Sequence, residues 1–97
     1  MSRRTFIRGL MLSVDAQVDA SIAQVIRHVS REAGVSAGDI LGPIKTWDIA
    51  HPRQEVMRIA HRVLGYSLTQ IGTVLGGRDH TTILNGIRSA EKRKASQ

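Results

Sequence analysis

Apolar residues recur every three or four positions between residues 14 and 33. The stripe consists of Val14, Val18, Ile22, Val25, Ile26, Val29 and Ala33. This spacing predicts one amphipathic helix, with Ser13 or Asp15 as its N-cap and Gly34 as the left-handed residue that ends it. Residues 1–12 show no such period, and we expect them to form a flexible N-terminal arm ahead of a single domain at residues 13–97.

The middle of the chain predicts a short helix, a loop and a longer helix. Ser36 is a cap residue with Asp39 three positions later, which favours a short helix through Leu41 before Gly42 and Pro43 stop it. Residues 44–50 have no sustained period and are predicted to be a loop. Pro52 suits the first turn of the next helix, because its missing N–H costs nothing there. The expected inward face of that helix is Val56, Met57, Ala60, Val63 and Leu64, and Gly65 ends it.

Two further helices follow, separated by a glycine pair. Ser67 and Gln70 form a capping box, and the helix they open would bury Leu68, Ile71, Val74 and Leu75. Gly76 and Gly77 break it. Asp79 can cap a last helix that runs to about Lys92, with Ile83, Leu84, Ile87 and Ala90 inward. No strand pattern occurs, so the predicted fold is all-α.

The layout of residues 67–92, a short helix, a glycine turn and a longer helix, is typical of a helix-turn-helix. Five polar residues open its second helix: Arg78, Asp79, His80, Thr81 and Thr82. The first turn of a recognition helix reaches base edges in the DNA major groove, where arginine pairs with guanine and threonine offers a methyl to thymine. The alternative is an ordinary helical pair in which Asp79 is only a cap.

Composition and charge narrow the classes of partner. The 97 residues carry a formal net charge of +6, and residues 42–97 hold nine Lys and Arg against four Asp and Glu. This excess suits a polyanionic partner. Only 3% of residues are aromatic, which argues against a base-stacking surface for single strands. The absence of cysteine excludes disulfides, zinc fingers and thiol catalysis.

Other classes of function find little support. The four histidines show no metal-ligand spacing, and no catalytic set can be assembled, so we expect no metal, no cofactor and no enzymatic activity. Arg3 and Arg4 resemble a twin-arginine signal, but charges interrupt the apolar stretch that follows. We therefore expect a cytoplasmic, nucleoid-associated protein without a membrane partner. Trp47, in the predicted loop, either anchors that loop on the core or contacts a partner.

Residues 22–92 resemble the C-terminal DNA-binding domain of the bacterial replication initiator DnaA. The resemblance rests on Pro52-Arg53-Gln54, on Ser67-Leu68 with Ile71-Gly72, and above all on the string Gly76-Gly77-Arg78-Asp79-His80-Thr81-Thr82. It implies a Trp-repressor-like helix-turn-helix bundle, here with an extra N-terminal arm, that binds double-stranded DNA at initiator boxes.

The resemblance also implies a set of DNA contacts. Arg78, Asp79, His80 and Thr81 would face bases, and Thr82 a phosphate. Arg53, Gln54 and Ser67 would lie on the DNA backbone. Lys45 stands where the family has a minor-groove arginine, Thr69 where it has a proline, and Asn85 where it has a histidine. Because lysine lacks the planar fork of arginine, we hypothesise a weakened minor-groove readout.

The chain contains no phosphate-binding Gly-x-x-x-x-Gly-Lys-Ser/Thr loop, and we expect no ATPase domain here. We therefore predict sequence-specific duplex binding that regulates replication initiation or transcription, as a monomer on DNA. The alternative is an adaptor, in which residues 1–33 bind the initiator or another replication protein and contact with DNA is weak.

Overall fold

The computed structural model describes residues 14–97, as α-helices joined by short connections. The elements are α2 (Val14–Ala33), α3 (Ala37–Leu41), α4 (Trp47–Arg58), the π-helical turn η1 (Ile59–Val63), α5 (Leu68–Val74) and α6 (His80–Ala95). No strand occurs within residues 14–97, so the all-α prediction is confirmed. The predicted flexible arm, residues 1–12, lies outside the described residues.

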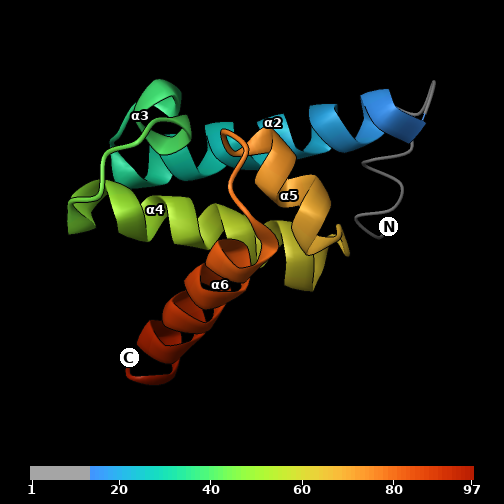
Figure 1. The fold of residues 1–97 in the computed structure, drawn as a ribbon. Coiled ribbons are helices and arrows are strands. Elements are labelled where there is room, and N and C mark those ends of the chain that lie inside the picture. Colours follow the sequence, from blue (N-terminus) through green and yellow to red (C-terminus); the bar gives the residue numbers. More distant parts are fainter. Residues whose placement is uncertain (1–13) are drawn as a thin grey trace, which may run out of the picture.

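The core forms where four of the helices meet. In Figure 1, α2 and α4 lie one above the other, α5 lies beside α2, and α6 crosses under α4 and runs away from α2. The core cluster consists of Ile22, Val25, Ile26, Val29, Ile40, Val56, Met57, Ala60, Ile71, Leu75, Ile83 and Ile87. Predicted inward positions in the cluster are Ile22, Val25, Ile26 and Val29 of α2, Ile71 and Leu75 at α5, and Ile83 and Ile87 of α6, as expected for helices with one apolar face.

Helices α3, α5 and α6 begin at the caps predicted for them. Of the two N-caps predicted for α2, Ser13 lies outside the described residues and Asp15 lies within the helix. The Ser36 side chain accepts from the Asp39 N–H, and Ser67 and Gln70 make both hydrogen bonds of a capping box. The Asp79 carboxylate accepts from the Thr82 N–H and begins α6. Gly34 follows α2 with a φ of +71°, the left-handed geometry expected of a glycine after a helix. Helix α6 runs to Ala95, three residues past the predicted end.

The predicted start of α4 is wrong. The helix begins at Trp47, so residues 47–50 are helical rather than loop, and Pro52 is the sixth helical residue. The Thr46 carbonyl starts the helix, since it accepts from the N–H groups of Ile49 and Ala50. Pro52 cannot donate to the Asp48 carbonyl, but this loss falls one turn after the start and does not end the helix.

The second half of this long helix also departs from prediction. Val63 was expected inward but is 38% exposed. The cause is η1, where Leu64 donates to Ile59 five residues back and each turn holds one residue more than an α-helical turn. This rotates Val63 away from the core, while Leu64 still packs against it. Gly65, at a φ of +81°, then turns the chain.

Trp47 does not anchor a loop. It is the first residue of α4 and is 73% exposed, so the anchoring interpretation is wrong. Its ring centroid lies 5.9 Å from that of His51, one turn along the same helix. Ala33 and Leu84, also expected inward, are exposed and half-buried respectively.

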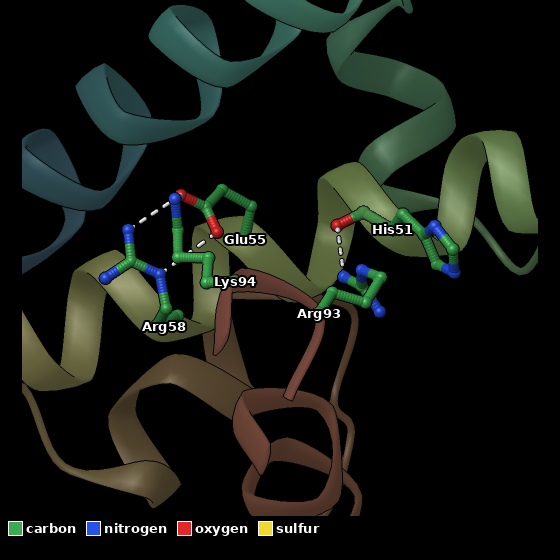
Figure 2. A network of polar contacts seen from close by, with 5 residues as sticks. All are labelled: His51, Glu55, Arg58, Arg93 and Lys94. Carbon is green, nitrogen blue, oxygen red and sulfur yellow. Dashed lines mark hydrogen bonds and ion pairs between the residues drawn. The ribbon is translucent and has the colours of Figure 1, made fainter. Parts of the chain in front are cut away.

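Polar contacts fix α6 against α4. Figure 2 shows Arg58 and Lys94 close to the carboxylate of Glu55, and Arg93 beside the His51 carbonyl. Burial raises the pKa of Glu55, but the hydrogen bond and charge of Arg58, helped by Lys94, outweigh burial and leave the pKa below its usual value. These contacts link one end of α6 to the middle of α4 and so orient the helix that carries the candidate site. None of the described helices combines the length and apolarity needed to cross a bilayer.

Candidate nucleic-acid interface

The first turn of α6 is an exposed polar surface on a rigidly held helix. Gly76 and Gly77 have φ values of +78° and +77°, a backbone geometry that side chains rarely tolerate, and they reverse the chain between α5 and α6. His80, Thr81 and Thr82 follow, all exposed. One turn later the helix is buried through Ile83 and Ile87. The first turn therefore projects outward from a fixed base, as a recognition helix requires.

A groove of about 330 Å³ runs between α4, α6 and the loop that joins α3 to α4. Six of the residues predicted from the sequence line it: Lys45, Arg53, Gln54, Arg78, Thr82 and Asn85. These come from positions 45 to 85 of the chain, so the fold brings together residues that the sequence only placed in separate segments. Ser67 and Thr69 at the start of α5, and Asp79, His80 and Thr81 at the start of α6, lie outside the groove lining.

Gly86, which sequence reasoning did not single out, forms part of the groove. A methyl group added at Gly86 would overlap the Met57 sulfur and lie 3.3 Å from the Gln54 Cγ, so α4 and α6 cross where no side chain separates them. A glycine inside a helical pattern is a signal of such close packing. Met57 and Ser89 also line the groove and were likewise not predicted to do so.

The side chain of Arg53 is buried among backbone carbonyls. The sequence prediction put it on the DNA backbone, but it is only 5% exposed. Its Nε donates to the Ile40 carbonyl at 2.6 Å, Nη1 to Ile44 at 2.7 Å, and Nη2 to Asp39 and Gly42 at 2.8 and 2.9 Å. Carbonyls at the end of a helix lack the full set of intrahelical donors, and the guanidinium supplies N–H donors to those of Asp39, Ile40 and Gly42, although Asp39 also accepts from the Gly42 N–H.

Arg78 is held in a similar way. It donates from Nη1 to the Leu75 carbonyl at 2.5 Å and from Nη2 to the Gly42 carbonyl at 2.6 Å. The Gly42 carbonyl thus accepts from two arginines. Burial and the nearby charge of Arg78 both lower the pKa of Arg53. The two like charges lie close together because both arginines donate to the Gly42 carbonyl.

The remaining predicted residues have distinct surroundings. Lys45 is exposed on the loop after α3. The Gln54 side-chain oxygen accepts a hydrogen bond from Arg93 at 2.7 Å, so this contact does not use the Gln54 amide nitrogen. Asp79 accepts from the Thr82 N–H at 2.8 Å, and these N–H groups at the helix start hold the pKa of Asp79 below its usual value. The carboxylate is therefore kept ionised beside the exposed histidine and threonines.

The basic side chains near His61 have protein partners. Arg58 pairs with Glu55, and Arg62 pairs with Glu91 across to α6. His61 itself is half-buried, with Nδ1 2.7 Å from the Tyr66 carbonyl oxygen. Among the described residues, no three histidine or acidic side chains gather in a way that could hold a metal ion.

This arrangement defines a helix-turn-helix DNA-binding domain, in which the exposed first turn of α6 lies beside a groove lined by basic residues. Comparison with known proteins gives the family. A family model described as the bacterial dnaA protein helix-turn-helix matches residues 22–89, and the chain belongs to this family.

Several relatives are chromosomal replication initiator proteins DnaA. The chain is 38% identical over 76 residues to that of Cereibacter sphaeroides, 35% over 89 residues to that of Neisseria gonorrhoeae, and 40% over 72 residues to that of Thermomicrobium roseum. The alignments cover 78%, 92% and 74% of this chain but 17%, 17% and 16% of the relatives. The chain therefore spans about a sixth of their length. Neither the family nor these relatives support the adaptor alternative.

Proposed function

We propose that this domain binds duplex DNA sequence-specifically, at sites similar to the boxes that replication initiators recognise. In this proposal the first turn of α6 enters the major groove, and binding regulates replication initiation or transcription. The observation that carries the proposal is the set of exposed side chains His80, Thr81 and Thr82, which project from a helix start held rigidly by a buried base. Their types match the donors, acceptors and methyl contacts used in direct readout.

The groove supplies the second part of the proposed interface. Thr82 and Asn85 line it from α6, and Lys45 lines it from the opposite loop. A DNA strand that follows this groove would place a phosphate near Thr82 and bring the adjacent minor groove to Lys45. Ser67 and Thr69, exposed at the start of α5, would lie against the neighbouring backbone.

Arg78 and Asp79 have a more restricted part in this proposal. Arg78 uses two of its N–H groups on protein carbonyls, so only its remaining N–H groups are available to a guanine. Asp79 uses one oxygen as the helix cap and offers the other to a cytosine amine. The domain would act as a monomer on DNA, in the cytoplasm and on the nucleoid.

The test begins with selection of bound sequences from a randomised duplex library. Affinity for the selected duplex and for a scrambled duplex is then measured at two salt concentrations. A specific binder should prefer the selected sequence by on the order of 10³-fold, a ratio that survives the higher salt. Wholly non-specific binding that disappears with salt would refute the proposal.

Single substitutions assign the reading residues. His80→Ala or Thr81→Ala should reduce the preference for the selected duplex and leave binding to scrambled DNA almost unchanged. Ser96→Ala, at the opposite end of α6, is the matched control and should alter neither. If His80→Ala and Thr81→Ala both retain the full preference, the first turn of α6 does not read the sequence.

A further inference from the structure

We infer that Arg53 is a positioning residue, which fixes the loop of residues 42–46, and with it Lys45, relative to the recognition helix. It does so from inside the protein and does not contact DNA. The inference rests on the proposed function, because it concerns how two parts of one DNA interface are held at a fixed spacing.

The guanidinium of Arg53 reaches carbonyls on both sides of the turn after α3. Three of its acceptors, Asp39, Ile40 and Gly42, belong to the end of α3, and the fourth, Ile44, lies one residue before Lys45. Arginine carries five N–H donors in a planar fork, and four are used here. The backbone on either side of Pro43 is therefore joined through one side chain, and the position of Lys45 follows from it.

The same carbonyl connects this loop to the recognition helix. The Gly42 oxygen accepts from Arg53 at 2.9 Å and from Arg78 at 2.6 Å. Arg78 lies immediately before Asp79, the cap of α6. Gly76 adds a close backbone contact, because a Cβ at that position would lie 3.1 Å from the Leu41 carbonyl oxygen. The turn before α6 and the loop that carries Lys45 are thus fixed to each other at one point.

This geometry opposes a direct phosphate contact by Arg53. A phosphate would have to compete with four carbonyls for a side chain that is 5% exposed. It would also remove the Arg53 donor from the carbonyl of Ile40, a fully buried residue, and a buried carbonyl that loses its hydrogen bond is costly. A rigid spacing between the major-groove and minor-groove contacts is instead what a sequence-specific interface needs, because displaced contacts lose their alignment with the bases.

Arg53→Lys separates the two roles, because it keeps the charge and removes the fork. We expect this variant to lose affinity for the selected duplex by about tenfold or more, the equivalent of one or two hydrogen bonds. The dependence of binding on salt should stay as in the wild type, since no phosphate contact is removed. Arg31→Lys, at an exposed position of α2, is the matched control. Full affinity in Arg53→Lys would overturn the inference.

A double-mutant cycle with Lys45→Ala adds a readout that a general loss of stability would not give. If Arg53 acts through Lys45, the two substitutions together should weaken binding by less than the product of their separate effects. Fully multiplicative effects would contradict the inference.

The wild-type protein provides a measurement that does not depend on how the variant folds. The Nε–H resonance of Arg53 should exchange slowly with solvent in the free protein and stay unchanged when the selected duplex is added. A large shift or loss of protection on DNA would show that Arg53 leaves the carbonyls, and would overturn the inference.

Failure of the proposed function would look different. In that case the wild type would show no preferred DNA sequence. The inference alone fails if the wild type prefers a sequence and Arg53→Lys binds that sequence with full affinity. In either case, hydrogen exchange of the backbone amides in residues 42–46 tests the structural claim that Arg53 holds this loop in place. Unchanged protection in Arg53→Lys would mean that Arg53 does not hold the loop.

Discussion

Gly72→Ala should destabilise the domain more than an ordinary surface substitution. Gly72 is buried in α5, and a Cβ added there would overlap the Arg78 carbonyl oxygen and lie 3.2 Å from the Arg78 carbonyl carbon. The obstacle is backbone, so no side-chain rotation can relieve it. The Gly72 carbonyl also accepts from the Arg78 N–H at 2.9 Å, so any displacement of the turn strains that hydrogen bond as well.

The size of the effect follows from opposing terms. Alanine in the middle of a helix is favoured over glycine by about 1 kcal/mol. Overpacking against a fixed neighbour costs about 1–3 kcal/mol, and a weakened backbone hydrogen bond adds about 1 kcal/mol. The net loss should be about 1–3 kcal/mol. For a domain of this size, it lowers the melting temperature by on the order of 10 °C.

The assay is thermal and denaturant unfolding followed by circular dichroism, with Gly38→Ala as the matched control. Gly38 lies in the short helix α3, and the nearest atom to an added Cβ is the Ser36 hydroxyl oxygen at 3.9 Å. The control should therefore be neutral or slightly stabilising. DNA affinity should fall in Gly72→Ala, because the turn it displaces sets the direction of α6. A Gly72→Ala protein as stable as Gly38→Ala would refute the reasoning.

Three other outcomes follow from the structure. Lys45→Arg should tighten binding to the selected duplex, because it restores the planar fork of arginine in the minor groove. Unchanged affinity in a titration would contradict the proposed minor-groove contact of residue 45. Asp79 has a lowered folded pKa, so its stabilisation is present above its usual value of 3.8 and disappears as the pH falls through the folded pKa. Because asparagine can also cap a helix, Asp79→Asn removes only the charge. The difference in melting temperature between the wild type and this variant should therefore shrink in acid, and a constant difference would contradict the lowered pKa of Asp79. Trp47→Ala should change the free energy of unfolding by no more than about 0.5 kcal/mol, because the ring is 73% exposed. A loss of about 2 kcal/mol in denaturant unfolding would show that the ring packs against the core.

Local signals predicted most of the helices. The capping box of Ser67 and Gln70, the Asp79 cap and the glycine after α2 all mark boundaries that the structure has. They were predictable because each depends on a few neighbouring residues. The start of α4 was not, because Pro52 is compatible with the first turn and also tolerated one turn later, and only the surrounding packing chose between them.

The candidate interface shows the same division. The polar first turn of α6 could be found from the sequence, because its residues are consecutive and a cap precedes them. The groove could not, since its lining residues lie up to 44 positions apart, from Lys45 to Ser89. Nor could the exposure of Val63, which depends on a π-helical turn that leaves no clear mark in the pattern of apolar residues.

Arg53 illustrates why some features could be predicted from the sequence and others required the tertiary structure. The sequence by itself determined the helices, the caps and the family, because helix periodicity and motif spacing are local properties. Only the tertiary structure decided which charges face solvent. The carbonyls of Asp39, Ile40 and Gly42 gather at the end of α3, and the fold places the fork of Arg53 against them. A residue that looks like a DNA contact in the sequence is thereby a buried hydrogen-bond donor in the folded protein.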